Sequence, residues 1–224
     1  MKTLPALFTA AALVLITVPA HADQAGAREK LQKDGIAFTP EAFLQKVAEG
    51  DASRAALFVE AGMDPSVKDG MNRTALWIAT EQKQLAVLKA LLAAGVAPNA
   101  QNAPAMEYGK SIVFAAVDTG DVELVRALAE AGADAKAAND YEMPPLAEAA
   151  RTGNVEMCKV LLKAGADPNA APAGFPLIYG PVNENHLEVV RLLLASGARL
   201  GEHKQALIEA AKEPELRALL EAAE

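Results

Sequence analysis

Apolar residues recur along the chain at the spacing of one helix face, in short runs that each end at a glycine. In one run Val155, Cys158 and Leu162 share a face, and Gly165 follows. Similar stretches are FVEAGMDPSV at 58–67, LLAAGVAPNA at 91–100, LAEAGADAKA at 128–137, LLKAGADPNA at 161–170 and LLASGARLGE at 193–202. Because glycine adopts a left-handed conformation at little cost, we predict a helix that ends at each of these glycines.

The glycines of these stretches set the period of the chain. They are Gly62, Gly95, Gly132, Gly165 and Gly197. Their spacings of 33, 37, 33 and 32 residues indicate a repeated unit of two helices and a turn. The second helix of a unit is predicted from shorter apolar runs, TALWIAT at 74–80, SIVFAAV at 111–117 and PPLAEAA at 144–150. Asp51, Asp121 and Asn154 stand before the longer runs as N-cap residues.

We therefore predict an all-α solenoid of about five helix-turn-helix repeats with a capping helix pair at its C-terminal end. The repeats are expected at 40–68, 69–101, 102–138, 139–170 and 171–200. Residues 23–39 are expected to form an N-terminal capping segment and residues 201–224 the C-terminal cap. Caps are needed because a terminal repeat has no neighbour to bury its apolar face.

Two segments of the chain resemble ankyrin repeats. They are GMNRTALWIATEQKQLAVLKALLAAGVAPNA and MPPLAEAARTGNVEMCKVLLKAGADPNA. The resemblance extends over roughly residues 40–224, because period, glycine, inner-helix motif and turn recur together. It implies an ankyrin-repeat solenoid, in which the tips of finger-like loops and the exposed side of the inner helices line one concave face. The family uses that face to bind other proteins.

The sequence departs from the family's pattern at three places. The position where the family carries a histidine holds, in turn, Trp77, Phe114, Ala147 and Tyr179. The hydrogen bonds of that histidine must therefore be absent or replaced. Pro181 falls in the inner helix of the fifth repeat, and since a proline in a helix interior costs about 3 kcal/mol, we expect a shortened or kinked helix. Four extra residues in the third repeat are expected to lengthen the finger at 102–110.

The N-terminal segment MKTLPALFTAAALVLITVPAHA, residues 1–22, has one lysine, an apolar run and an A-x-A motif. This order is typical of a secretory signal peptide, with cleavage after Ala22 and export to the bacterial periplasm. An uncleaved membrane anchor is the alternative, but the apolar run is short for a membrane span. After cleavage we expect no stable membrane insertion.

Charge and composition narrow the choice of partner. The chain has 21 basic and 29 acidic residues, a net charge of −8, and loss of Lys2 with the signal peptide makes it −9. Nucleic acids and anionic lipids are therefore poor partners. Cys158 is the only cysteine, so the fold cannot contain an internal disulfide. We expect a buried and inert thiol on an outer helix.

The sequence contains no motif for a catalytic triad, a nucleotide, a metal or another cofactor, so we expect a protein that is not an enzyme and has no cofactor. Asp64, Asp134 and Asp167 recur at one position of the turn and are interpreted as turn residues. A hydrolase site in the groove is the alternative from another class. Glu81 and Asp118 are the one pair of carboxylates that could serve it.

The candidate protein-binding residues are those that the resemblance places at the fingers and at the ends of the inner helices. They are Lys68, Met71, Asn72, Glu81, Met106, Glu107, Tyr108, Asp118, Asp140, Tyr141, Glu142, Arg151 and Phe175. Tyr108 and Tyr141 each stand beside acids, which suits a partner protein with a basic and partly apolar surface. We expect a monomeric binding module or scaffold. An inhibitor or immunity protein against an envelope enzyme, and a structural spacer, are the other readings.

Overall fold

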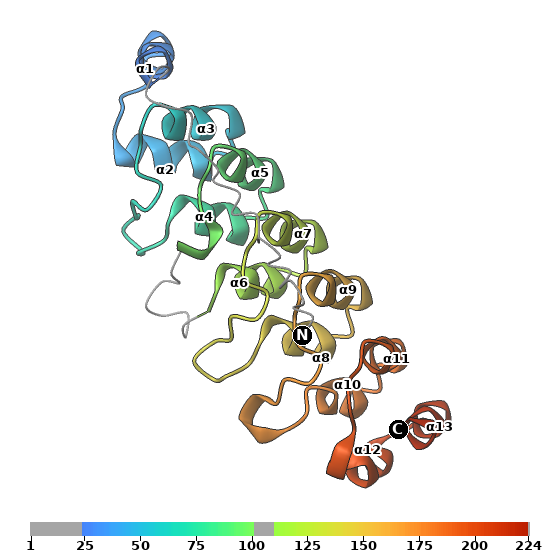
Figure 1. Ribbon diagram of the computed structural model, residues 1–224. Coiled ribbons are helices and arrows are strands. Elements are labelled where there is room, and N and C mark those ends of the chain that lie inside the picture. The colour runs from blue at the N-terminus through green and yellow to red at the C-terminus, as the bar shows by residue number, and fades with distance from the viewer. Residues whose placement is uncertain (1–23, 101–109, 224) are drawn as a thin grey trace, which may run out of the picture.

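The chain is a single file of helix pairs, as the computed structural model of residues 24–100 and 110–223 shows (Figure 1). The inner helices are α2 (Pro40–Ala48), α4 (Ala75–Glu81), α6 (Ile112–Asp118), α8 (Pro145–Arg151), α10 (Tyr179–Asn183) and α12 (Lys204–Ala210). The outer helices are α3 (Ala52–Glu60), α5 (Leu85–Ala93), α7 (Val122–Glu130), α9 (Val155–Lys163), α11 (Leu187–Ala195) and α13 (Pro214–Ala222). The predicted all-α fold is confirmed, since these residues hold no β-strand but only an isolated bridge between Lys68 and Thr74.

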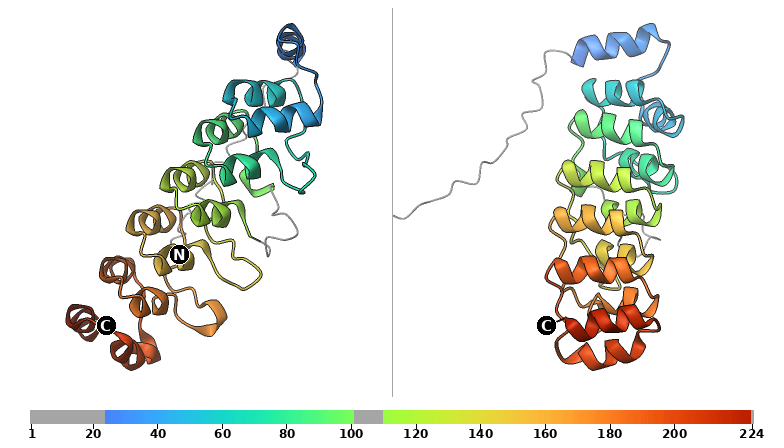
Figure 2. Two further views of the ribbon diagram at one scale, coloured as in Figure 1. Left: turned by 180° about the vertical axis from the view of Figure 1, so that it is seen from behind. Right: turned by 90° about the vertical axis from the view of Figure 1, so that its right-hand side faces the viewer.

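Inner and outer helices form two layers that run the length of the stack (Figures 1 and 2). Each outer helix packs on the next outer helix along the chain, from α3 to α13, and the inner helices from α2 to α12 do the same. α1 (Gln24–Lys33) packs against α3 at the N-terminal end, where its side chains Ala27 and Leu31 are buried. The pair of α12 and α13 closes the other end, so each helix pair stabilises its neighbours.

Short polar side chains begin the outer helices, as the sequence predicts. Asp51 accepts a hydrogen bond from the Arg54 N–H at 3.1 Å, and Asn154 accepts one from the Met157 N–H at 3.0 Å. Asp121 accepts from the Glu123 N–H at 2.9 Å. Each bond satisfies a donor that has no partner inside the helix, and the predicted N-caps are confirmed.

Alanines allow neighbouring inner helices to approach closely. Ala79 in α4, Ala116 in α6 and Ala149 in α8 are fully buried, and Trp77 is the largest of the fully buried side chains. Cys158 is buried in α9, and burial raises the pKa of its thiol to about 12. The thiol is therefore neutral at physiological pH and unreactive, as predicted. None of the described helices combines the length and the hydrophobicity needed to cross a bilayer.

The Gln84 amide and the His186 imidazole each tie a helix pair to the pair before it. Gln84 Nε2 donates to the Ala48 carbonyl at 3.0 Å, and His186 Nε2 lies 3.0 Å from the Arg151 carbonyl oxygen. Gln84 stands directly before the outer helix α5 and reaches the end of α2, and His186 stands directly before α11 and reaches the end of α8. They fix the spacing of consecutive pairs, because each satisfies a carbonyl that the helix end leaves without a partner.

The fifth repeat contains the short inner helix that the sequence predicts. α10 has 5 residues, whereas α4, α6 and α8 have 7 each. Pro181 is the third residue of α10 and therefore lies in the first turn, where its missing N–H removes no hydrogen bond within the helix. The shortening is confirmed, and the cost of a proline in a helix interior does not arise.

Three short 3₁₀ turns complete the described structure, η1 (Pro98–Ala100), η2 (Pro172–Gly174) and η3 (Gly201–His203). The predicted signal peptide at 1–22 lies outside the described residues. So do residues 102–109 of the predicted long finger.

Candidate functional site

Loops that join each outer helix to the next inner helix project from one side of the stack, beside the inner helices (Figure 1). We name three of these fingers after the residue at the tip: the Met71 finger (61–74), the Tyr141 finger (131–144) and the Phe175 finger (164–178). Met71, Tyr141 and Phe175 have exposed fractions of 63%, 62% and 59%, and they are the large hydrophobic residues that the described chain exposes. All three stand on fingers, and exposed apolar groups gathered on one side of a protein mark an interaction site.

The Met71 finger is a hairpin held by the Asp69 side chain. Asp69 Oδ1 accepts from the Met71 and Arg73 N–H groups, both at 2.9 Å. The Asp69 N–H donates to the Arg73 carbonyl at 3.0 Å, and Asn72 has a left-handed φ of 64°. Burial raises the pKa of Asp69, but the hydrogen bonds from Arg73 and Met71 outweigh this effect and lower that pKa below its ordinary range.

The Tyr141 finger has the same hairpin, built by an asparagine. Asn139 Oδ1 accepts from the Tyr141 N–H at 3.0 Å and the Met143 N–H at 3.1 Å. The Asn139 N–H donates to the Met143 carbonyl at 3.0 Å, and Glu142 has a left-handed φ of 58°. The two hairpins therefore present Met71 and Tyr141 at equivalent positions.

The Phe175 finger has a different backbone. It contains the 3₁₀ turn η2, where Ala173 has a positive φ of 52°. The Phe175 ring lies edge-on to the ring of Tyr179, the first residue of α10, with centroids 6.0 Å apart and planes at 63°. This pair places an aromatic surface at the base of the finger, next to the exposed tip.

Glu81, Asp118 and Arg151 are the last residues of α4, α6 and α8, and each forms an ion pair. Glu81 Oε2 lies 3.1 Å from Arg73 Nη1, and Asp118 Oδ2 lies 2.6 Å from Lys110 Nζ. Both pairs join residues eight positions apart and link the base of a finger to the end of its inner helix. Arg151 instead binds Glu148 of α8 through two nitrogens, at 2.6 and 2.9 Å.

The structure brings most of the predicted site residues to this one side of the stack. Lys68, Met71, Asn72, Asp140, Tyr141, Glu142 and Phe175 lie on exposed stretches of the three fingers, and Glu81, Asp118 and Arg151 end inner helices. We call these residues together the finger face. Met106, Glu107 and Tyr108 lie outside the described residues, so the predicted patch of Tyr108 with Tyr141 stays a prediction.

Other groups that could carry chemistry are engaged in the fold. The oxygens of Asp64, Asp134 and Asp167 each accept from a backbone N–H two residues later, at 2.8 Å, which confirms that they are turn residues. Glu81 and Asp118 each face a cation, an arrangement that neutralises both carboxylates. In the described ranges no three His, Cys, Asp or Glu side chains are grouped to hold a metal ion.

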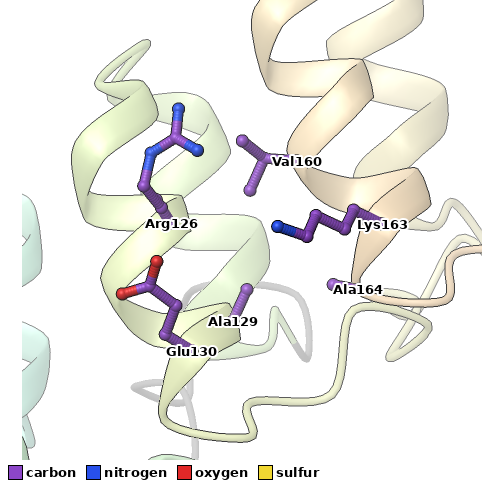
Figure 3. Close-up of a pocket in the computed structure, with 6 residues that line it drawn as sticks. All are labelled: Arg126, Ala129, Glu130, Val160, Lys163 and Ala164. Atoms are coloured by element: carbon purple, nitrogen blue, oxygen red, sulfur yellow. The ribbon is translucent and has the colours of Figure 1, made fainter.

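A pocket of about 200 Å³ lies on the opposite side, between the outer helices α7 and α9. Arg126, Ala129, Glu130, Val160, Lys163 and Ala164 line it (Figure 3). Lys163 extends across the opening toward α7 (Figure 3). The pocket is smaller than the usual ligand site of roughly 300–1,000 Å³ and is ringed by solvated charges.

Sequence reasoning missed two residues that contact the finger face, Lys110 beside Asp118 and Tyr179 beside Phe175. The signal for Lys110 was present, because the spacing of Arg73 to Glu81 is repeated by Lys110 to Asp118. For Tyr179, the sequence indicates only that it stands at the position where ankyrin repeats carry a histidine. Its contact with Phe175 depends on the 3₁₀ turn η2, which no local pattern indicated.

Comparisons with known proteins agree with this architecture of stacked helix pairs and projecting loops. A family model for ankyrin repeats in three copies matches residues 95–172, and a model for a single ankyrin repeat matches residues 71–103. No curated protein matches the chain.

Among solved structures, the chain is similar to the ankyrin repeat domain of Bcl-3, described as a unique member of the IkappaB protein family. The TM-score is 0.70 at 25% sequence identity, and the match covers 89% of this chain and 92% of that one. The chain therefore contains ankyrin repeats and has the ankyrin-repeat fold, which is a protein-interaction scaffold and generally not enzymatic. In all, 429 chains of solved structures match, so the fold alone does not select a partner.

Proposed function

We propose that this protein is a monomeric, non-enzymatic binding module or scaffold of the bacterial periplasm, and that it binds a partner protein on the finger face. One observation carries the proposal: the exposed large hydrophobic residues of the described chain, Met71, Tyr141 and Phe175, all stand on fingers. Aromatic and methionine side chains are enriched at protein interfaces. A partner that is basic and partly apolar complements these residues together with the acids Asp140 and Glu142.

The binding face is tested by truncating its two exposed aromatic residues. Tyr141→Ala with Phe175→Ala should weaken capture of the partner by about 1–4 kcal/mol, because large side chains at interface centres dominate affinity. Stability should change little, since both side chains are exposed in the free protein.

The matched control removes two acids from the outer helices. Glu123→Ala and Glu156→Ala break surface ion pairs with Arg126 and Lys159, and such pairs contribute little to stability. Capture should be unchanged in this control. A loss of stability as large as that of a core truncation in the aromatic variant would mean that Tyr141 and Phe175 are packing elements, and the assignment of the face would be wrong.

Export rests on the order of Lys2, the apolar run and the A-x-A motif before Asp23. N-terminal sequencing of the protein from the periplasmic fraction should return Asp23. Recovery with membranes, or an N-terminus at Met1, would contradict the proposed location and leave the binding face untouched.

A further inference from the structure

We infer that the Tyr141 and Phe175 fingers bind a partner segment in which a Lys or Arg side chain stands beside a large apolar side chain. This inference rests on the proposed function and specifies the chemistry of the partner. Three features carry it: the exposed aromatic groups of two neighbouring fingers, the excess of acids over cations on the Tyr141 finger, and the equal numbers of acids and cations on the Met71 finger, which serves as a comparison.

The two fingers lie in consecutive repeats, and the inner helices to which they lead, α8 and α10, are packed against each other. Tyr141 and Phe175 are both more than half exposed, and the Tyr179 ring beside Phe175 extends the aromatic surface of that finger. A large apolar side chain of a partner would remove this surface from water.

On the Met71 finger the acids Asp64 and Asp69 are matched in number by the cations Lys68 and Arg73. Asp69 Oδ2 lies 2.7 Å from Arg73 Nη2, and the same guanidinium reaches Glu81 at 3.1 Å. At the end of the next inner helix, Lys110 faces Asp118 at 2.6 Å. In these two repeats, the acid at the end of the inner helix forms an ion pair with a cation at the base of the finger.

The Tyr141 finger lacks this balance. Asn139 occupies the position of Asp69, and Met143 occupies that of Arg73, so the base of the hairpin is neutral. Arg151 is occupied by Glu148 in its own helix. Neither Asp140 nor Glu142 forms an ion pair with any residue in the described part of the chain, and these two acids flank Tyr141.

A basic side chain at this tip meets an aromatic ring and two carboxylates at once. A Lys or Arg cation is attracted to the face of a tyrosine ring and to carboxylates, whereas an acidic side chain there meets two like charges. A single exposed ion pair contributes at most about five-fold in affinity, so the two acids together are needed to select the charge of the partner. The apolar neighbour of the cation supplies the contact with Phe175.

The test uses random dodecapeptides displayed on phage and selected on the immobilised full chain. Selected peptides should carry Lys or Arg within two positions of Leu, Ile, Phe, Tyr or Trp. A synthetic peptide of the consensus sequence then serves as the probe, and fluorescence anisotropy measures its affinity. Asp140→Asn with Glu142→Gln should weaken binding by about ten-fold, because it removes both carboxylate charges from the tip without changing side-chain size.

The matched control removes two charges of the same sign from the outer helices. Glu60→Gln in α3 with Glu130→Gln in α7 should change the affinity by less than about two-fold, since exposed charges far from the site are screened. Equal weakening by the two double variants would show attraction to net charge alone and overturn the inference.

Two further results would also overturn the inference. A consensus without a basic residue that still depends on Tyr141 and Phe175 would leave the proposed function standing and refute only the charge preference. Failure to enrich any peptide would refute recognition of a short basic segment, while capture of a folded partner by the finger face would remain measurable through the Tyr141→Ala and Phe175→Ala variant.

Discussion

Lys83 occupies a backbone position that suits glycine better than any residue with a side chain. It joins α4 to α5 with a φ of 55°, and the equivalent residues in other helix pairs include Gly50, Gly120 and Gly153, with φ of 79°, 74° and 74°. In this left-handed region the Cβ atom of an L-residue approaches the following carbonyl oxygen. Lys83 therefore holds strain that its neighbours in the stack avoid.

Lys83→Gly should stabilise the protein by about 0.5–1 kcal/mol, because relief of this strain exceeds the added flexibility of the unfolded chain. Urea unfolding followed by circular dichroism measures the change. The reverse substitution at the equivalent position, Gly120→Ala, should destabilise. A loss of stability in Lys83→Gly would show that the lysine side chain makes contacts worth more than the strain.

Trp77 carries a buried donor that the fold does not satisfy. The side chain is 1% exposed, and its Nε1 has no hydrogen-bond partner among the described residues. An unsatisfied buried donor costs about 1–3 kcal/mol, which offsets part of what the large ring contributes by packing. Phe114 fills the equivalent position of the next repeat without such a donor.

Trp77→Phe should consequently lie within about 1 kcal/mol of the parent, whereas Trp77→Ala should cost about 3–5 kcal/mol. The comparison requires only denaturation midpoints of the two variants. A large loss in Trp77→Phe would mean that the full volume of the indole is needed.

For single residues, the sequence predicted the helix caps and turns, whose hydrogen bonds join residues that are close along the chain. The caps Asp51, Asp121 and Asn154 and the turn residue Asp64 bond to backbone groups two or three residues away, so the local pattern was sufficient. The orphan donor of Trp77 depends on packing between repeats, which the local pattern does not contain.

At the scale of the element, fingers are joined to the following repeat by asparagine side chains. Asn169 Nδ2 donates to the Gly197 carbonyl at 3.0 Å, and Asn169 Oδ1 accepts from the Arg199 N–H at 2.9 Å. Asn99 makes the same pair of bonds to Gly132 and Asp134. Each amide thus connects the ends of two consecutive outer helices.

Asn169→Ala should destabilise the protein by about 1–2 kcal/mol through the loss of two hydrogen bonds, which leaves the Gly197 carbonyl and the Arg199 N–H dependent on water. Thermal unfolding measures the loss. Asn169→Asp provides the control, because it keeps the acceptor for Arg199 and loses only the donor, so its effect should be smaller. Equal effects of the two variants would show that the retained acceptor bond is offset by repulsion between the new carboxylate oxygen and the Gly197 carbonyl.

The Met71 finger should be sensitive to acid through Asp69. The pKa of this carboxyl is lowered in the folded protein, so its contribution to stability is present above the unfolded pKa of about 3.9 and is lost as pH falls through the folded value. Asp69→Asn keeps the shape of the hairpin, as Asn139 demonstrates in the Tyr141 finger. The variant should be less stable than the parent at pH 7, and the difference in Tm should shrink below about pH 4. A difference that stays constant with pH would contradict this role.

The sequence predicted the existence of the fingers better than their construction. Glycine and the recurring Asp-Pro-Asn residues marked the turns, because those residue types have strong local preferences. That Asp69 and Asn139 hold identical hairpins, and that Arg73 bridges Asp69 to Glu81, depends on groups that meet only when the chain folds back. The difference in charge between the two fingers became visible for the same reason only in the structure.

For the whole molecule, the period of the glycines was enough to predict the stack, because each repeat contacts mainly its neighbours and the same interface recurs. The sequence predicted on which side of the stack the site lies, but not the contacts that its residues make. Glu81, Asp118 and Arg151 could be placed at equivalent helix ends by counting residues, but which of them are neutralised depends on Arg73, Lys110 and Glu148. The period carries no information on the partner, because it reports packing within the chain.

The same nearest-neighbour organisation makes stability uneven along the stack. The end of the molecule from 171 to 223 combines the shortest inner helix, α10, with a final pair that has a neighbour on one side only. Hydrogen exchange should therefore show amides of α10 to α13 opening before those of α6 to α9. Equal or greater protection at the C-terminal end would contradict this order.

The variant Pro181→Ala separates the two possible causes of early opening. If the proline itself weakened α10, its replacement would restore protection to residues 171–223. Pro181 lies in the first turn, where an N–H has no acceptor within the helix, so alanine adds a buried donor and no helical hydrogen bond. We therefore expect unchanged or lower protection in this variant, because the length of α10 and its place near the end of the stack set the order of opening. A gain in protection would show that the proline strains the helix even in its first turn.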